Sequence, residues 1–159
     1  MSDTTPRLTT RTFENRAMAR GLAVEYLMKK PAFAKLPFGH WSRVLTGQIR
    51  RGHYAFVLQG NKVVGFGGWA AVAESQAEAW LAGKPDATEV SGDTGDCAVI
   101  NAWAADGPEA NDALVAEAMR RTQEFRMVYA KREYEDGRTR PVRMPTKRDR
   151  LPATDRSPS

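Results

Sequence analysis

The sequence predicts an α+β domain with a mostly antiparallel central sheet, and three observations lead to this prediction. Apolar residues recur at helical spacing in two segments near the N-terminus. Further along, two pairs of short segments rich in branched and aromatic residues each surround a turn signal, as in β-hairpins. The chain has 159 residues, the size of one domain with its own core. The predicted element order is ααββαβαββ.

Two helices are predicted first. One covers 15–30 and ends before Pro31, with two lysines in its last turn, where they suit the helix dipole. The other covers 38–51 and ends at Gly52. Apolar residues recur at helical spacing in the first helix, in the rows Met18, Leu22, Tyr26 and Ala19, Ala23, Leu27. In the second helix Trp41, Val44, Leu45 and Ile49 lie on one face.

Strands and helices alternate in the rest of the chain. HYAFVLQ (53–59) and KVVGFGGWA (62–70) predict a hairpin across Gly60-Asn61. Glycines inside a strand are costly, so we expect a bulge or a close approach in the second of these strands. The remaining expected elements are a helix at 71–82, a polar loop at 83–95, a central strand at 97–104, a helix from Pro108 to about Phe125, and a hairpin of 125–133 and 138–144 across Glu135-Asp136-Gly137.

Composition divides the chain into a polar flexible leader at 1–14, a folded domain at 15–144 and a basic tail at 145–159. The tail is poor in apolar residues and is expected to be disordered. One cysteine and two histidines leave little material for a metal centre, so no metal is predicted. Apolar runs are too short to span a bilayer, and no signal peptide is recognised; a cytoplasmic location is the expectation.

Charge is strongly polarised along the chain. Residues 1–68 carry 11 basic and 3 acidic side chains, a net charge of +8, whereas residues 69–117 carry 1 basic and 10 acidic, a net charge of −9. Residues 118–159 carry a net charge of +6. Such a chain can present a basic surface to an acidic partner, either a protein or a nucleic acid.

Three motifs at conserved separations resemble one family of enzymes. EYLMKKPAFAKLP (25–37), HYAFVLQGNKVVGFGGWA (53–70) and GDCAVINAWAADG (95–107) resemble the toxin-activating lysine acyltransferases of hemolysin-type operons. The resemblance runs from about Gly21 to Met144. It implies a fold similar to the GCN5-related (GNAT) acetyltransferases, and transfer of a fatty acyl group from acyl carrier protein to lysines of an RTX toxin. Acyl carrier protein would be the donor, no other cofactor is implied, and a homodimer is compatible with the resemblance.

The sequence departs from the family at the catalytic positions. The family's catalytic histidine position is Phe33 here, and its catalytic aspartate position is Asn101. Its serine position is Lys30, and the tryptophan before the second proline is Leu36. Because a lysine has an ordinary pKa of about 10.4, its attack on a thioester needs a base. Phe33 cannot act as a base, and Asn101 cannot carry a negative charge.

Few residues could replace the missing base. His40 follows the linker and is the best candidate, although a histidine at a helix start is more often structural. His53 is more simply a polar strand-end residue, and Cys97 a small buried apolar residue. Asp96 and Asp106 fit turn-forming roles.

The resemblance assigns further residues to binding. A basic group would dock the acidic acyl carrier protein through charge complementarity: Lys29, Lys30, Lys35, Arg43, Arg50 and Arg51. Gly67, Gly68 and Trp69 would line the acyl cleft. The four tryptophans, Trp41, Trp69, Trp80 and Trp103, fit core positions better than stacking platforms.

Two other functions stay open on the sequence alone. The chain could be a non-catalytic relative that uses the same fold to hold a protein or lipid partner in an assembly. A nucleic-acid-binding module ranks third, because aromatic residues are not interleaved with the basic ones.

Overall fold

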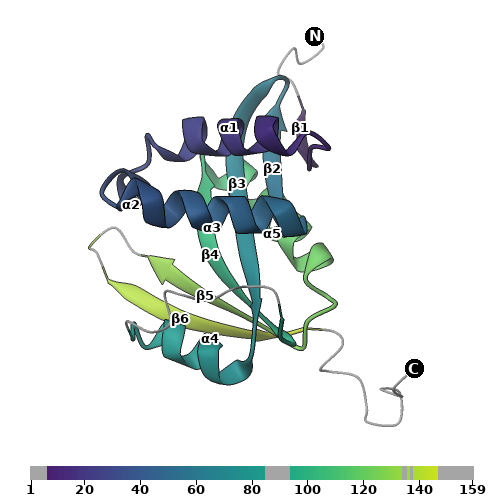
Figure 1. The fold of residues 1–159 in the computed structure, drawn as a ribbon. Helices are drawn as coiled ribbons and strands as arrows, with labels where there is room; N and C mark the ends of the chain where they lie inside the picture. The colour runs from purple at the N-terminus through teal and green to yellow at the C-terminus, as the bar shows by residue number, and fades with distance from the viewer. Residues whose placement is uncertain (1–6, 85–93, 134–135, 137, 147–159) are drawn as a thin grey trace. The chain divides into compact units, whose positions relative to one another are not determined.

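The structure of the chain is a computed structural model, and it describes residues 7–84, 94–133, 136 and 138–146. Figure 1 shows an α+β fold in which helices flank a sheet with the strand order β1-β2-β3-β4-β5-β6. Strand β4 pairs with β5 in parallel, while β1·β2, β2·β3 and β5·β6 are antiparallel, so the sheet is mixed. The elements are β1 (Leu8–Arg11), α1 (Arg16–Leu27), α2 (Pro31–Ala34), α3 (Phe38–Arg51), β2 (Tyr54–Gln59), β3 (Lys62–Val72), α4 (Glu74–Leu81), β4 (Cys97–Ala105), α5 (Pro108–Arg121), β5 (Met127–Glu133) and β6 (Thr139–Pro145).

The chain divides into two compact units. Unit 1 comprises Met1–Gly68 and Ala102–Ala118, and unit 2 comprises Trp69–Asn101 and Met119–Ser159. Strands β3 and β4 and helix α5 contribute residues to both units.

In unit 1, alternating side chains of β2 belong to two apolar layers. Tyr54, Phe56 and Leu58 pack with α1, α2 and α3. Ala55 and Val57 pack with the first half of α5. Because successive side chains of a strand point to opposite faces, helices cover both faces of this part of the sheet.

Strand β3 contains the bulge that its glycines predict. The pairing with β2 passes from Val57↔Gly65 to Leu58↔Val63, which makes Val64 the extra residue. Side chains also approach the glycines closely: a Cβ atom at Gly67 would lie 2.9 Å from the Trp103 ring. The glycines of GFGGW therefore fit both expectations, and the groups that approach them are the chain's own side chains.

In unit 2, α4 packs against the starts of β4 and β5. The buried cluster there comprises Ala70, Val72, Ala77, Cys97, Val99 and Tyr129. Arg143 of β6 donates two hydrogen bonds, of 2.8 and 2.6 Å, to the Glu78 carboxylate of α4. Strand β6 is the last in the order, and its prolines Pro141 and Pro145 lie opposite Lys131 and Met127 of β5.

Several predicted elements are confirmed. Helix α3 has the predicted bounds, and Gly52 ends it in the left-handed conformation with φ 74°. The hairpin at Gly60-Asn61 and the strand beginning at Cys97 are present. The second hairpin pairs β5 with β6, although Asp136 is the part of its turn that is described.

Other predictions need correction. The leader at 1–14 contains strand β1, which pairs with β2. The helix predicted at 15–30 ends at Leu27, so the two lysines lie beyond its last turn, and the linker holds the short helix α2. Because β3 continues to Val72, α4 starts only at Glu74. The helix predicted to reach Phe125 ends at Arg121.

Two predicted irregular segments fall mainly outside the described residues. These are the polar loop at 83–95 and the tail at 145–159. At the start of the tail, Pro145 ends β6 and Thr146 is buried.

Candidate functional site

Phe33, the family's histidine position, is a core residue. Pro31 begins the one-turn helix α2, and this turn directs Phe33 into the cluster formed by α1, α3 and β2. Its side chain is only 8% exposed. The ring lies edge-on to Trp41, with centroids 6.0 Å apart. At the family's histidine position, the chain therefore has a buried aromatic ring that packs in the core.

Lys30 instead joins a polar cluster that the sequence did not indicate. Its ammonium is hydrogen-bonded and ion-paired to the Asp106 carboxylate and lies 4.6 Å from the centre of the Tyr26 ring. The Tyr26 hydroxyl lies 3.0 Å from Asp106 Oδ1 and 3.1 Å from the Val64 carbonyl oxygen, and its one proton can be donated to either acceptor. The cluster connects the end of α1, the residue before α2 and the end of β4.

The environment of this cluster fixes its protonation. Partial burial acts to raise the pKa of the Asp106 carboxyl, but hydrogen bonds from Lys30 and Tyr26 outweigh it and leave the pKa below its ordinary value. Burial, followed by the hydrogen bond to Asp106, raises the pKa of Tyr26 well above its ordinary value. At neutral pH, Asp106 is therefore a carboxylate and Tyr26 a neutral phenol.

The same cluster lines a cleft in unit 1. The cleft has a volume of about 370 Å³ and is lined by Leu22, Glu25, Tyr26, Lys29, Lys30, Asn61, Lys62, Val63 and Asp106. Its walls combine an apolar side with ammonium and carboxylate groups. Asp106, which the sequence assigned to a turn, is thus a cleft residue.

His40, the candidate base, is half-buried in the first turn of α3. Its backbone N–H donates to the carbonyl of Pro37 at 3.0 Å. Arg43, Gly47 and Arg50 follow it at spacings that place all four residues on one side of the helix. A Cβ atom at Gly47 would lie 2.8 Å from Nη1 of Arg51, so the Arg51 guanidinium covers this glycine.

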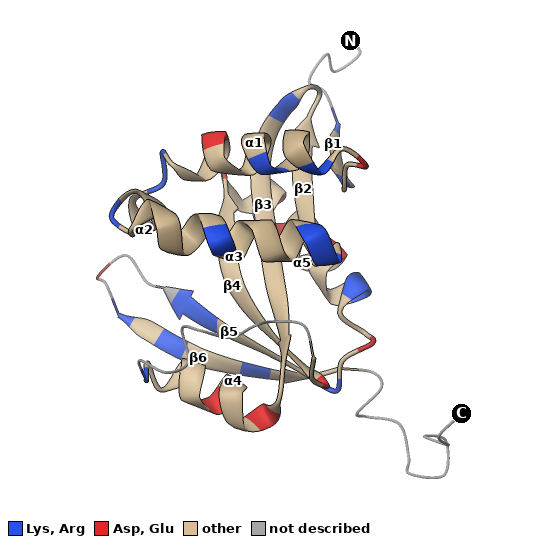
Figure 2. Cartoon of the chain, viewed as in Figure 1, with Lys and Arg blue, Asp and Glu red and all other residues tan. Residues whose placement is uncertain are grey.

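Three members of the predicted basic group, Lys29, Lys30 and Lys35, lie next to α2. Lys29 and Lys35 are exposed, whereas Lys30 is ion-paired to Asp106. Arg43 and Arg50 on α3 are also exposed. Figure 2 shows the blue segments of Lys and Arg along α3.

Asn101, the family's aspartate position, belongs to unit 2. It is partly buried on β4. The parallel pairing of β4 with β5 runs from Cys97↔Met127 to Val99↔Tyr129, and it ends there although both strands continue. Asn101 lies two residues beyond this point.

The residues predicted to line an acyl cleft are closely packed. Gly67 and Gly68 belong to unit 1, where the side chains of Trp103 and Gln48 cover them. Trp69 belongs to unit 2, is 1% exposed, and has the Arg121 guanidinium 5.3 Å from its ring centre. Trp41 is also buried, and Trp80 and Trp103 are partly buried against core clusters, as expected for core tryptophans.

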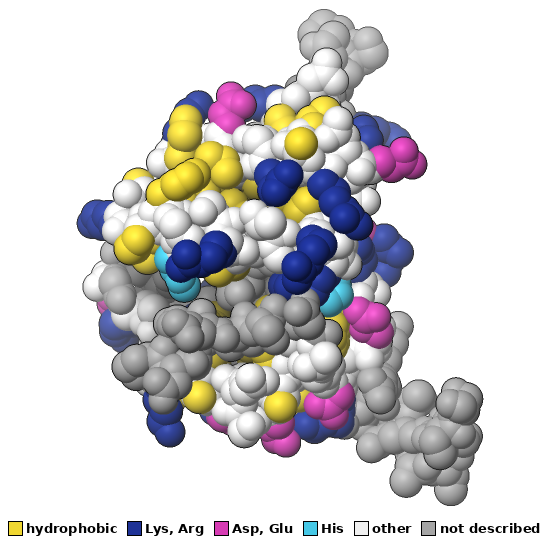
Figure 3. Space-filling view, in the orientation of Figure 1, with side chains coloured by type: hydrophobic (Ala, Val, Ile, Leu, Met, Phe, Trp, Pro, Cys, Tyr) yellow, Lys and Arg dark blue, Asp and Glu magenta, His cyan; other side chains and the backbone are white. Residues whose placement is uncertain are grey.

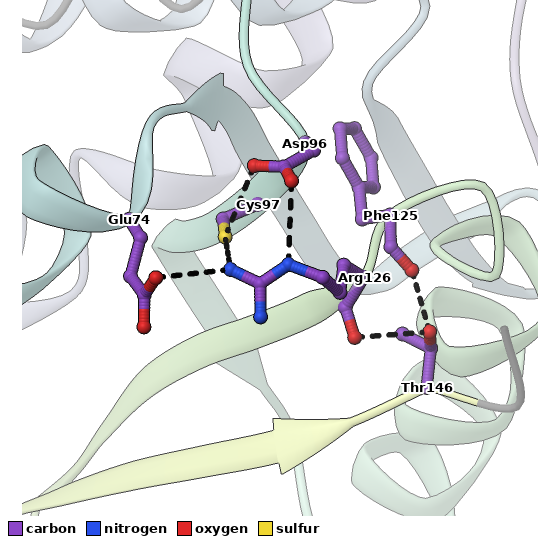
Figure 4. Close-up of polar contacts among 6 residues, drawn as sticks. All are labelled: Glu74, Asp96, Cys97, Phe125, Arg126 and Thr146. Carbon is purple, nitrogen blue, oxygen red and sulfur yellow. Dashed lines mark hydrogen bonds and ion pairs between the residues drawn. The ribbon is translucent and has the colours of Figure 1, made fainter. Parts of the chain in front are cut away.

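Cys97 lies in a second polar cluster, drawn in Figure 4. Arg126, at the start of β5, forms ion pairs of 3.2 Å with both Glu74 and Asp96, and Nη2 lies 3.6 Å from Sγ of Cys97. Burial, followed by the charge of Asp96, raises the pKa of the Cys97 thiol to about 11. Cys97 is thus a buried, protonated thiol, as the sequence led us to expect.

Three further observations concern metal ligands, His53 and the helices. Across residues 7–84, 94–133, 136 and 138–146, no group of three or more His, Cys, Asp or Glu side chains could hold a metal ion. His53 precedes β2, and its backbone N–H donates to the carbonyl of Gln48 at 2.9 Å. None of the helices in the described part is long and apolar enough to cross a membrane.

The fold has clear counterparts among solved structures, although no family model and no curated protein matches the sequence. An agmatine N-acetyltransferase (S171A, apo form) has a TM-score of 0.59 and 12% identity, over 80% of this chain and 76% of that chain. The polyamine N-acetyltransferase of Drosophila melanogaster gives 0.57 and 11%, over 80% and 77%. The loading GNATL domain of CurA from Lyngbya majuscula gives 0.58 and 13%, over 82% and 67%.

At these identities the comparisons establish the fold. The chain therefore has a GNAT-like acyltransferase fold, as the resemblance implied. The fold comparison does not single out the toxin-activating family among acyltransferases.

Proposed function

We propose that this chain transfers a fatty acyl group from acyl carrier protein to a protein lysine, as its resemblance to the toxin-activating acyltransferases implies. The observation that carries the proposal is the short parallel pairing of β4 with β5, which ends at Val99↔Tyr129 while both strands continue. Just beyond this pairing, the backbone of β4 in unit 2 could pair with an extended ligand arm as it would with an added strand. An acyl-bearing carrier arm has this extended shape.

The basic surface of unit 1 supports an acidic donor. Arg43 and Arg50 are exposed two helical turns apart on α3, and Lys35 is exposed just before this helix. Such charges raise the rate of encounter with an acidic carrier protein and orient it. No further cofactor is needed for acyl transfer from a thioester.

The base in this proposal is His40. Phe33 cannot remove a proton from the acceptor lysine, and its place in the core leaves no room for a base. His40 is half-buried in the first turn of α3, and histidine is the side chain used most often as a general base. Asn101 would hydrogen-bond and orient a reacting group without supplying charge.

One observation favours a second function. Phe33 and Trp41 fill the family's base position with packed rings, which suits a non-catalytic subunit that holds a protein partner. The two functions differ in whether any acyl group moves.

Intact mass spectrometry separates them. The chain is mixed with palmitoyl acyl carrier protein and lysine-containing acceptor proteins, and the masses of all components are followed. We expect an acceptor to gain one palmitoyl mass as the carrier loses its thioester, and His40→Gln to slow this by at least about 100-fold. His53→Gln is the matched control and keeps the rate. Unchanged masses together with a stable complex would establish the non-catalytic function instead.

A further inference from the structure

The strongest unexplained surface feature lies at the turn between α1 and α3. Three large apolar side chains are exposed there: Met28 at 49%, Leu36 at 43% and Phe38 at 63%. We call these three residues, with Lys29 and Lys35 beside them in sequence, the apolar tip. Figure 3 shows hydrophobic side chains at the surface over the α1–α2 end of unit 1, with Lys and Arg side chains next to them.

The backbone of the apolar tip is well fixed. Pro31 occupies the first position of α2, and Pro37 is the residue before α3. The Leu36 N–H donates to the Phe33 carbonyl at 3.1 Å, while the Phe38 ring lies edge-on to Trp41 with centroids 5.5 Å apart. Because the backbone that carries the exposed side chains is already ordered, little backbone entropy is lost when a partner buries them.

The segment that carries the apolar tip is basic, with the exposed Glu25 lying one helical turn before Lys29. From Tyr26 to Ala73 the sequence contains no Asp or Glu, and it contains seven basic residues. Of these, Lys30 is neutralised by Asp106, whereas Lys29 and Lys35 are exposed beside the apolar side chains. The complementary partner is therefore anionic and offers an apolar interior.

We propose that the apolar tip inserts into the surface of an anionic lipid bilayer and anchors this protein there reversibly. Phe, Leu and Met side chains flanked by lysines suit the boundary between headgroups and acyl chains. The three side chains are exposed, and none of them lines the cleft at Tyr26. A protein partner would need a matching pocket for each projecting side chain, whereas a fluid bilayer needs none.

Vesicle co-sedimentation at physiological ionic strength tests the proposal, with no acyl donor or acceptor present. The full chain should sediment with phosphatidylcholine vesicles that contain phosphatidylserine and stay in solution with phosphatidylcholine alone. The double variant Leu36→Ser/Phe38→Ser should lower the partition coefficient at least about tenfold. Val115→Ser is the matched control, because Val115 is also 43% exposed but lies on α5; its partitioning should not change.

The charges are tested separately. Lys29→Ser and Lys35→Ser should each weaken binding about fivefold, since one lysine near an anionic membrane contributes about 1 kcal/mol. Lys84→Ser removes an exposed lysine of unit 2 and should have no such effect.

A third test gives a signal on binding, so it does not depend on a loss of binding that an unfolded variant would also show. The fluorescence of Phe38→Trp should shift to shorter wavelength when anionic vesicles are added, because the new indole enters the bilayer. No shift, or wild-type binding that survives loss of both Leu36 and Phe38, would overturn the proposal. Binding to acyl carrier protein that depends on Phe38, without vesicle binding, would make the apolar tip a protein interface and would also overturn it. Because the vesicle assays contain no acyl donor or acceptor, their outcomes do not depend on whether the chain transfers an acyl group.

Discussion

The side chain of Gln48 in α3 lies directly over Gly68 in β3. A Cβ atom at position 68 would be 2.2 Å from Oε1 of Gln48. Gln48 is fully buried, so its amide has little space into which it could move. A helix residue thus occupies the volume that any side chain at position 68 would need, and this explains why the buried strand has a glycine there.

Gly68→Ala should lower the free energy of unfolding by about 1–3 kcal/mol, because the added methyl group overpacks the site. Urea denaturation measures the loss. Gly39→Ala is the control: a Cβ at position 39 meets nothing within 4 Å, and alanine favours the helix, so stability should be equal or slightly higher. Shortening the partner, as in Gln48→Ala/Gly68→Ala, should cost less than the sum of the single changes. Strict additivity would contradict the steric explanation.

Phe33→Ala should destabilise the protein by about 3–5 kcal/mol, as expected for loss of a buried ring. Phe33→His, which introduces the family's residue, should also destabilise it and should not raise the rate of acyl transfer above that of the wild type, since the imidazole would be buried against Trp41. Chemical denaturation and the mass assay provide the two measurements. Phe38→Ala is the exposed aromatic control and should change stability by about 0.5 kcal/mol or less. Equal effects at positions 33 and 38 would show that Phe33 is not a core residue.

Asp106→Asn should make stability less dependent on pH in the acid range. The pKa of Asp106 is lower in the folded chain than its ordinary value, so the carboxylate stabilises the fold at neutral pH and this contribution disappears as the pH falls through the folded pKa. Both partners are partly exposed, so we expect about 0.5–1 kcal/mol at pH 7. Thermal unfolding of the wild type and variant should differ at neutral pH and converge at about pH 2. A difference that grows with acidity would have the wrong sign.

Cys97 should resist alkylation in the folded protein. With its pKa raised to about 11, only about 0.1% of the thiol is ionised at pH 8, and the side chain is buried. Iodoacetamide labelling followed by mass spectrometry should be almost undetectable in buffer over minutes and complete in denaturant. Rapid labelling in buffer would mean that the start of β4 opens readily.

Local patterns predicted the elements whose signals lie within a few residues. The helix ending at Gly52 and the hairpin at Gly60-Asn61 have their stop and turn residues in the sequence, and the structure confirms both. Strand β1 was missed because LTTR is short and only half-buried, and it becomes a strand by pairing with β2, which is distant in sequence. Helix α2 was missed because the short segment between Pro31 and Pro37 resembles a linker.

The polar clusters around Asp106 and Arg126 could not be predicted either, because their members are distant in sequence. Tyr26 and Lys30 meet Asp106 from about eighty positions away, and only the folded sheet brings them together. In sequence, Asp106 next to glycine is typical of a turn. Arg126 likewise reaches Glu74 and Asp96 from a distant strand. By contrast, burial of Cys97 and of Trp41 was predictable, because each lies in an apolar pattern.

The prolines of β6 bear on how the protein behaves at high concentration. Pro141 and Pro145 are four residues apart, so their nitrogens face the same side of the strand. A proline in a paired strand places its nitrogen away from the neighbour, here away from β5. That outer side therefore lacks two N–H donors that an incoming strand would need, and the exposed Arg140 adds charge repulsion. This end of the sheet is thereby protected against growth into aggregates.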